Sequence, residues 1–110
     1  MDNIVRGIVG AGKSTPGEGW QPHNEGIYVD VDTSSANFRS DLDTPVYLIS
    51  LSGTGGTRRM WNALGASTVH EPTERGFRVY LKHVRDASLP PSQAQEAGWY
   101  INWIGVQKVS

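Results

Sequence analysis

The chain has 110 residues, a formal net charge of −1 and no cysteine. This length predicts one domain, and the near-neutral charge gives no basic footprint for nucleic acid or an anionic membrane. The lack of cysteine excludes a disulfide framework and a thiolate metal site. No apolar run approaches the roughly 18 residues of a membrane span, and no signal peptide is recognisable at the start. We therefore expect no cofactor, no nucleic acid and no inserted membrane segment, and the localisation stays open.

The first third of the chain predicts two strands separated by a long loop. Residues 4–10 predict a short first strand, and residues 11–26 are rich in glycine and proline, which indicates a loop. Trp20 in this loop is expected to close one end of the core. Residues 27–32 alternate apolar and polar, which is typical of a strand with one buried face. Phe38, alone in a polar stretch, is expected to plug into the core.

The middle and later segments predict further strands and one turn of helix. Residues 46–51 are apolar on both faces of a strand, which predicts a central position. Residues 60–71 fit a helix or a strand, with their glycine and β-branched residues favouring the strand. Residues 77–82 alternate again. Residues 92–97 predict one helical turn whose first residue, Ser92, is the N-cap and whose stop is the next glycine.

The last strand, residues 99–106, is the most apolar stretch of the chain. Alternation places Trp99 and Trp103 on one face and Asn102 on the other, where a buried amide needs hydrogen-bond partners. Six strands at this spacing predict an all-β protein, a six-stranded antiparallel β-sandwich. We expect a single domain over residues 1–110, with residues 1–26 as a glycine-rich N-terminal strand and loop and residues 27–108 as the main sandwich.

A phosphate-binding pattern near the start does not predict a nucleotide site. Residues 7–14 match the pattern G-x-x-x-x-G-K-[ST], which works only when a helix follows the loop. Prolines and glycines directly after Ser14 forbid that helix. Asp30 and Asp32 lie on one face of a strand. This pair could serve in acid–base catalysis or bind calcium, but the favoured interpretation is a solvent-exposed face that carries charges. The three histidines lack zinc-ligand spacing. We therefore do not expect an enzyme.

Charged and aromatic residues gather in two predicted loops. Arg58, Arg59 and Trp61 follow the third strand, and His83 and Arg85 follow the fifth. An aromatic ring can stack on the C–H face of a sugar while charged groups bind its hydroxyls. The alternative is that Trp61 packs in the core and that the charges are ordinary loop residues. The residues alone do not decide between these two interpretations.

Three stretches together resemble the H-type lectin domain, a family that includes snail agglutinins and the C-terminal domain of discoidins. Similar domains form the tips of phage tail fibres. The three stretches are the proline-led strand over residues 44–51, the segment 71–80 with its Gly-Phe start of a strand, and the aromatic strand 99–106 with Trp-Ile. The resemblance covers about residues 17–108. It implies a six-stranded antiparallel sandwich, typically a homotrimer, that binds galactose or N-acetylgalactosamine near the junction between subunits.

The resemblance also implies contact residues for the sugar. Arg58 or Arg59 matches the family's arginine. His83 matches its histidine, although it falls about two positions early and follows Lys82 where the family has tryptophan. Glu18 or Glu25 matches its acidic residue. Asn102 is expected to line a subunit interface along the threefold axis.

The sequence therefore predicts a non-catalytic carbohydrate-binding, lectin-like module that acts as an oligomer. The alternative function is a structural trimerisation or assembly domain of a fibre, a tail or a larger secreted protein. In that case Tyr28, Arg78 and Tyr80, on the outer faces of their strands, would form the interface.

Overall fold

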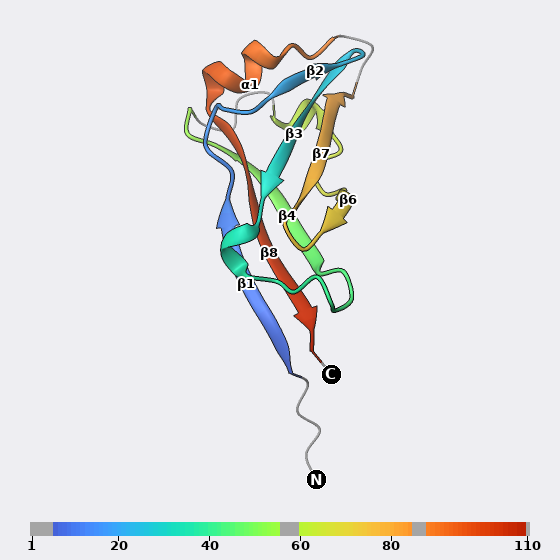
Figure 1. Ribbon diagram of the computed structural model, residues 1–110. Coiled ribbons are helices and arrows are strands. Elements are labelled where there is room, and N and C mark those ends of the chain that lie inside the picture. The colour runs from blue at the N-terminus through green and yellow to red at the C-terminus, as the bar shows by residue number, and fades with distance from the viewer. Residues whose placement is uncertain (1–5, 56–59, 85–87, 110) are drawn as a thin grey trace.

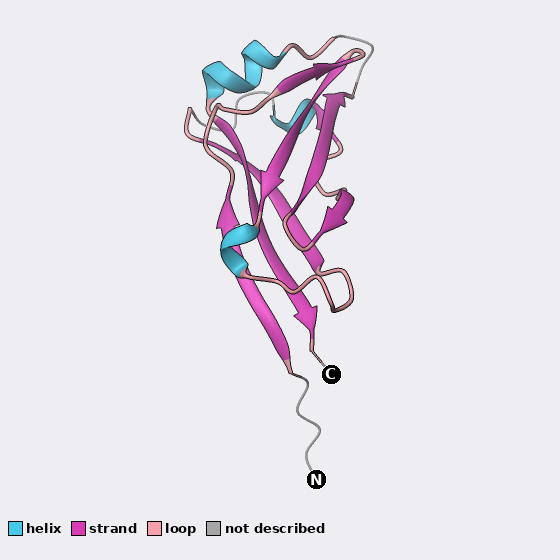
Figure 2. Cartoon of the chain, viewed as in Figure 1, coloured by secondary structure: helices cyan, strands magenta, loops and turns pink. Residues whose placement is uncertain are grey.

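The computed structural model describes residues 6–55, 60–84 and 88–109. In chain order its elements are β1 (Gly7–Lys13), β2 (Gln21–His23), β3 (Gly26–Asp32), η1 (Ser34–Ala36), β4 (Val46–Gly53), η2 (Met60–Asn62), β5 (Ala63–Leu64), β6 (His70–Thr73), β7 (Gly76–His83), α1 (Pro91–Ala97) and β8 (Trp99–Lys108). Two antiparallel sheets form a sandwich-like β protein of 55 × 25 × 21 Å (Figures 1 and 2). Within the described ranges, no helix is long and apolar enough to cross a membrane.

The first sheet has the strand order β1-β8-β4, so the most apolar strand of the sequence lies in its middle. β8 pairs antiparallel with both neighbours over nearly its full length. β1 includes most of the segment that matches the phosphate-binding pattern, and its residues are in extended ladder pairing with β8. A strand cannot wrap its amides around a phosphate, so the match has no loop geometry behind it.

The second sheet has the order β2-β3-β7-β5, and β6 also pairs with β7. β3 and β7 are its long strands, and both alternate between buried and exposed residues as the sequence predicted. β2 and β3 form a hairpin, and β5 and β6 pair with different parts of β7. The short helix α1 lies across one end of the molecule (Figure 1).

The core lies between the two sheets. Inward residues of β3, β7 and β8 fill it, and nine hydrophobic ones are at most 5 % exposed: Ile27, Val29, Val31, Phe77, Val79, Leu81, Trp99, Ile101 and Trp103. Trp20 closes one end as expected, because it is buried and its indole N–H donates a hydrogen bond of 3.0 Å to the Trp99 carbonyl. Phe38 is also buried and packs edge-on against Tyr47, 5.9 Å between ring centroids.

Tyr47 joins the two sheets through its hydroxyl group. The hydroxyl donates a hydrogen bond of 2.6 Å to the Thr73 carbonyl and lies 2.8 Å from Thr33 Oγ1, which therefore donates to it. A Cβ at Gly105 would lie 2.9 Å from the rings of both Tyr47 and Phe38, so the glycine lets these rings pack close to the β8 backbone. Burial raises the pKa of the Tyr47 hydroxyl, while the Thr33 hydrogen bond acts in the opposite direction.

Several sequence predictions need correction. The described residues contain eight strands rather than six, because the short β2, β5 and β6 have too few residues for a clear alternation. β4 is an edge strand, not a central one, and its outward apolar residues are exposed. The first strand is Gly7–Lys13 rather than 4–10, and it is hydrogen-bonded into the first sheet. Ser92 is not the N-cap, since α1 begins at Pro91 after Pro90; the C-terminal stop at Gly98 is confirmed.

Candidate functional site

The structure describes only part of the predicted sugar-binding set. Arg58, Arg59 and Arg85 lie outside the described residues, as does the side chain of Trp61. Glu25 lies in the turn between β2 and β3 and lines a hollow in the surface. The two members of the set whose side chains the structure describes are therefore Glu25 and His83.

His83 does not join Glu25 in that hollow. It is the last residue of β7, and the alternation of this strand places it on the same side as the buried Val79 and Leu81. Tyr80 and Lys82 occupy the opposite, outward side and line the hollow. The candidate acid from the sequence is thus part of the site, and the candidate imidazole is not.

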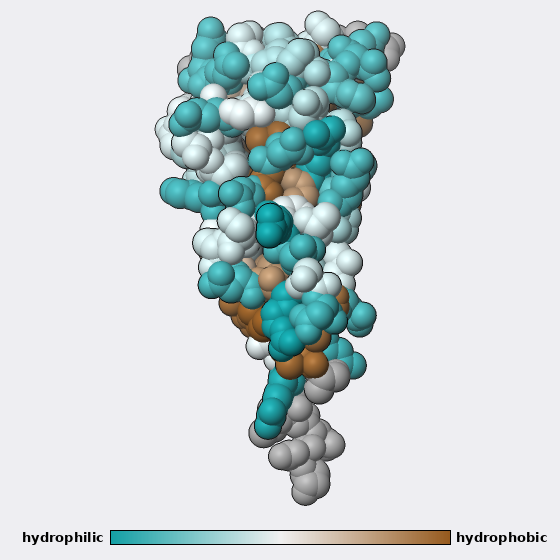
Figure 3. All heavy atoms as spheres, viewed as in Figure 1, coloured by the Kyte–Doolittle hydropathy of each residue, from teal (hydrophilic) through white to brown (hydrophobic). Residues whose placement is uncertain are grey.

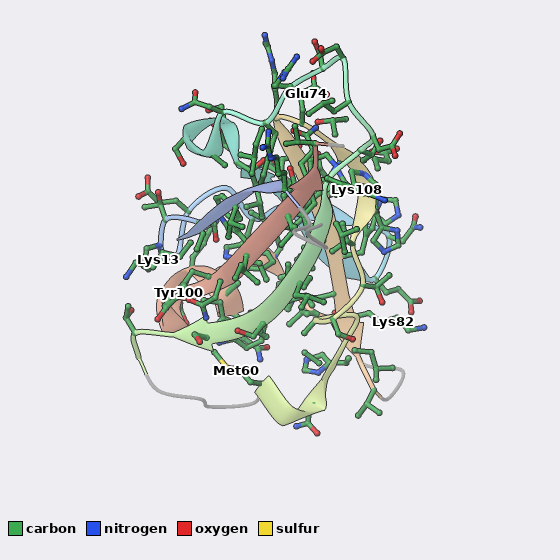
Figure 4. The ribbon with its side chains drawn as sticks, turned by 90° about the horizontal axis from the view of Figure 1, so that it is seen from below. Lys13, Met60, Glu74, Lys82, Tyr100 and Lys108 are labelled. Atoms are coloured by element: carbon green, nitrogen blue, oxygen red, sulfur yellow. The ribbon has the colours of Figure 1, made fainter. Side chains whose placement is uncertain are left out.

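The hollow has a volume of about 460 Å³ and lies between the β2–β3 turn, β6 and β7. Its polar lining residues are His23, Asn24, Glu25, His70, Tyr80 and Lys82. The volume falls within the roughly 300–1,000 Å³ of small-molecule sites. Figure 4 shows Lys82 on the outer side of the second sheet, across the molecule from Lys13 and Tyr100 on the first. The site therefore belongs to one face of the sandwich.

The β2–β3 turn holds Glu25 at the rim of the hollow. Asn24 takes a left-handed backbone with φ 53°, a conformation that asparagine tolerates better than most residues. A side chain at Gly26 would come within 2.3 Å of the Leu81 carbonyl oxygen, so only glycine lets the turn lie this close to β7. The Glu25 carbonyl accepts a hydrogen bond of 2.8 Å from the Leu89 amide. The Glu25 residue is exposed at the rim of the hollow.

Tyr80 forms the centre of an aromatic cluster at this site. The imidazoles of His23 and His70 each lie with their ring centroids 4.8 Å from that of Tyr80. Tyr28, the direct partner of Tyr80 across the β3–β7 pair, lies 5.8 Å away. Four strands, β2, β3, β6 and β7, thus bring four rings together, and Tyr80 remains only half-buried.

Arg78 braces the two tyrosines rather than facing the hollow. Its guanidinium lies 4.0 Å from the centroid of the Tyr28 ring. It also donates two hydrogen bonds to Asp30, with Nε 2.6 Å from Oδ1 and Nη2 3.0 Å from Oδ2. The Asp30 hydrogen bonds raise the pKa of Arg78 above its already high value. The pair of Asp30 and Arg78 therefore fixes the ring cluster, which agrees with a supporting role for Asp30 rather than acid–base work.

A bulge in β6 brings His70 beside Tyr80. The pairing of β6 with β7 shifts register between His70 and Thr73, and Glu71 within the bulge has a positive φ of 51°. Bulges commonly redirect a side chain near a functional site. A glutamate backbone in the left-handed region is strained, and strained residues of this kind cluster at functional sites.

The lining groups suit a ligand rich in hydroxyl groups. The Glu25 carboxylate accepts hydrogen bonds, the Lys82 ammonium donates them, and the Asn24 amide and the imidazoles can do both. Tyr80 offers apolar ring surface for C–H groups. Within the described ranges, no three histidine, aspartate or glutamate residues gather as metal ligands.

Sequence reasoning missed His23, Asn24, His70 and Tyr80 as members of one site. The outward position of Tyr80 was predictable from the alternation of its strand. No local signal relates His23 to His70, because they meet only through the pairing of β2 with β3, of β3 with β7 and of β7 with β6. No family model, no curated protein and no solved structure matches this chain.

Proposed function

We propose that the protein is a non-catalytic carbohydrate-binding module with an H-type lectin-like arrangement of its sandwich. Its sugar site is the hollow between the β2–β3 turn, β6 and β7. The expected ligand is a sugar of the galactose or N-acetylgalactosamine type. The site predicted from the sequence included His83, whereas the proposed hollow lies on the outer side of the second sheet, away from the side that His83 faces.

One observation carries the proposal: Tyr80 lies between two imidazoles in a hollow whose rim carries Glu25. A sugar presents an apolar C–H face and hydroxyl groups at its edge, and both find partners here. The tight Gly26 turn and the bulge at Glu71 hold these groups in place before a ligand arrives. Preorganised groups of this kind lower the ordering cost of binding.

A glycan-array screen of the native protein tests the proposal, followed by a titration of the best sugar by NMR. Glu25→Gln keeps the shape of the side chain and removes its charge. The glutamine oxygen still accepts, so a hydrogen bond of about 1.5–3 kcal/mol to a charged group becomes a neutral one of about 0.5–1.5 kcal/mol. The dissociation constant should therefore rise about fivefold to tenfold. Glu18→Gln is the matched control, because Glu18 is an exposed glutamate that does not line the hollow.

A second pair of variants separates this site from the one that the family resemblance implies. His70→Ala should weaken sugar binding several-fold, whereas His83→Ala should change it less than about twofold. Circular dichroism establishes that each variant remains folded. A silent array at high protein concentration, or a loss of binding in His83→Ala but not in His70→Ala, would contradict this location of the site.

Assembly without ligand binding is the second candidate function. The observation that favours it is a row of exposed apolar side chains on the outer face of the first sheet. Tyr28, Arg78 and Tyr80, the interface residues named from the sequence, contact one another on the outer side of the second sheet. A stable oligomer that binds no sugar would favour this second function.

A further inference from the structure

The outer face of the sheet β1-β8-β4 carries aliphatic side chains where polar ones are usual. Five large ones are 44–69 % exposed: Val9, Val46, Leu48, Ile104 and Val106. The strand register places Val9, Val106 and Val46 in one row and Ala11, Ile104 and Leu48 in the next. Figure 3 shows apolar surface on the narrow part of the molecule where these strands project. The five side chains therefore form one patch across three strands.

The rest of this face is polar but almost free of charge. Asn102 donates hydrogen bonds to Ser50 and Ser52, with nitrogen–oxygen distances of 3.2 and 2.8 Å. Lys13, at one edge, lies with its ammonium 5.1 Å from the centroid of the Tyr100 ring. Besides Lys13, the charged outward residue of these three strands is Lys108, at their other end. The desolvation free energy of a face with this composition is small, because it carries few charges.

The exposed area is sufficient for an interface. At their exposed fractions, the five aliphatic side chains present on the order of 500 Å² of accessible surface. The largest apolar patch of a typical monomer is about 300–600 Å² and is often functional. With the flanking serines, Asn102 and Tyr100, the face approaches the roughly 800 Å² that each partner buries in a stable dimer.

We propose that this face docks onto a second copy of the chain, sheet against sheet. A second copy fits because the face combines rows of aliphatic side chains with groups that both donate and accept hydrogen bonds, and such a face can meet its own copy across a twofold axis. Aliphatic side chains of two pleated sheets interdigitate at a spacing of about 10 Å. Ser50 and Ser52 accept from Asn102 and each keeps its own proton to donate, so the polar group of one copy can pair with that of the other.

This arrangement leaves the ligand hollow open. Lys82, which lines the hollow, lies across the molecule from Lys13 and Tyr100 on the docking face (Figure 4). Each copy therefore presents its own hollow away from the contact, in contrast to a sugar site at a subunit junction. Two outward hollows in one dimer would raise the apparent affinity for a glycan surface by about 10²–10⁴. The docking itself does not depend on the proposed sugar binding.

Sedimentation velocity without sugar tests the proposal, over protein concentrations of about 1 to 100 µM. The wild type should sediment at twice the monomer mass or more. Leu48→Lys and Val46→Glu each place a charge in the patch and should weaken association at least about 100-fold. Val84→Lys is the matched control, since Val84 is 51 % exposed and lies outside the patch, and it should associate as the wild type does.

Because the substituted residues are exposed in the single chain, the variants should keep the wild-type circular dichroism spectrum. Their melting temperatures should match that of the wild type at protein concentrations where it is monomeric. A wild type that stays monomeric at the highest concentration overturns the proposal and leaves the face to another occupant. Normal association of both Leu48→Lys and Val46→Glu overturns it too. A sugar titration of monomeric Leu48→Lys should give an unchanged single-site dissociation constant. A loss of sugar affinity together with the oligomer would instead place the sugar site at the contact.

Discussion

Gln107 provides the sharpest test of how the fold is held together, because its amide fastens a long loop to β8. Its side chain is 1 % exposed. Its oxygen accepts a hydrogen bond of 2.7 Å from the Arg39 amide, and its nitrogen donates to the carbonyls of Arg39 and Asp43 at 2.7 and 3.0 Å. The three bonds join β8 to a loop 64 and 68 residues earlier in the chain. Gln107→Leu keeps the approximate volume and removes all three.

The cost follows from what the substitution leaves behind. A buried polar group without a partner costs about 1–3 kcal/mol. Arg39 and Asp43 are exposed residues, so water can reach part of the released backbone. We therefore take the lower end for each bond and subtract a small gain from burying leucine. The free energy of unfolding should fall by about 2–3 kcal/mol. Gln107→Glu keeps the hydrogen-bond acceptor but loses both donated hydrogen bonds. Its free energy of unfolding near neutral pH should be lower than that of the wild type by a similar amount.

Urea denaturation followed by tryptophan fluorescence measures this effect. For a slope of about 1–1.5 kcal/mol per molar urea, the midpoint should move down by about 2 M with the slope unchanged. Lys108→Gln, an outward-facing neighbour on the same strand, is the control and should stay near the wild-type midpoint. If Gln107→Leu unfolds within about 0.3 M of the wild type, the loop does not depend on these hydrogen bonds and the reasoning fails.

Two further predictions concern the buried aromatic residues. Because burial raises the pKa of Tyr47 above its ordinary 10.0, the folded chain keeps this proton after the unfolded chain loses it. The stabilisation is complete below pH 10 and falls by up to about 1.4 kcal/mol per pH unit as the pH rises towards the folded pKa. Unfolding free energies measured from about pH 9 to 11 should thus fall more steeply for the wild type than for Tyr47→Phe, and parallel slopes would contradict this. Trp20→Phe removes the hydrogen bond to the Trp99 carbonyl and leaves a cavity, so the melting temperature measured by calorimetry should drop by roughly 10 °C. A drop of less than about 3 °C would show that the loop readjusts around the smaller ring.

The alternating strands were predictable because their signal is local. β3 and β7 have the pattern of a half-buried strand, and the structure buries the residues that this pattern assigns to the core. The same rule placed Trp99 and Trp103 on the inner face of β8 and Asn102 on the other. The sandwich-like β class follows from these strands together. The finer H-type lectin assignment stays a proposal.

The position of β4 shows where a local pattern stops being informative. Apolar residues on both of its faces predicted a central strand, yet Val46 and Leu48 are 68 % and 69 % exposed on an edge strand. Edge or centre is decided by which strands pair, and pairing joins residues far apart in the chain. The same exposed row is the basis of the proposed docking face, so the wrong prediction and the inference have one cause.

The candidate site was likewise predictable from the sequence only in part. The sequence by itself determined that Tyr80 and Lys82 face outward, that Asn102 lies opposite the tryptophans, and that Glu25 stands before a strand, because each statement concerns neighbours along the chain. Only the tertiary structure decided that Glu25 rather than Glu18 lines the hollow, and that His23 and His70 meet at Tyr80. Those encounters depend on strand register and on a bulge at Glu71, and both are set by packing between segments that share no local pattern.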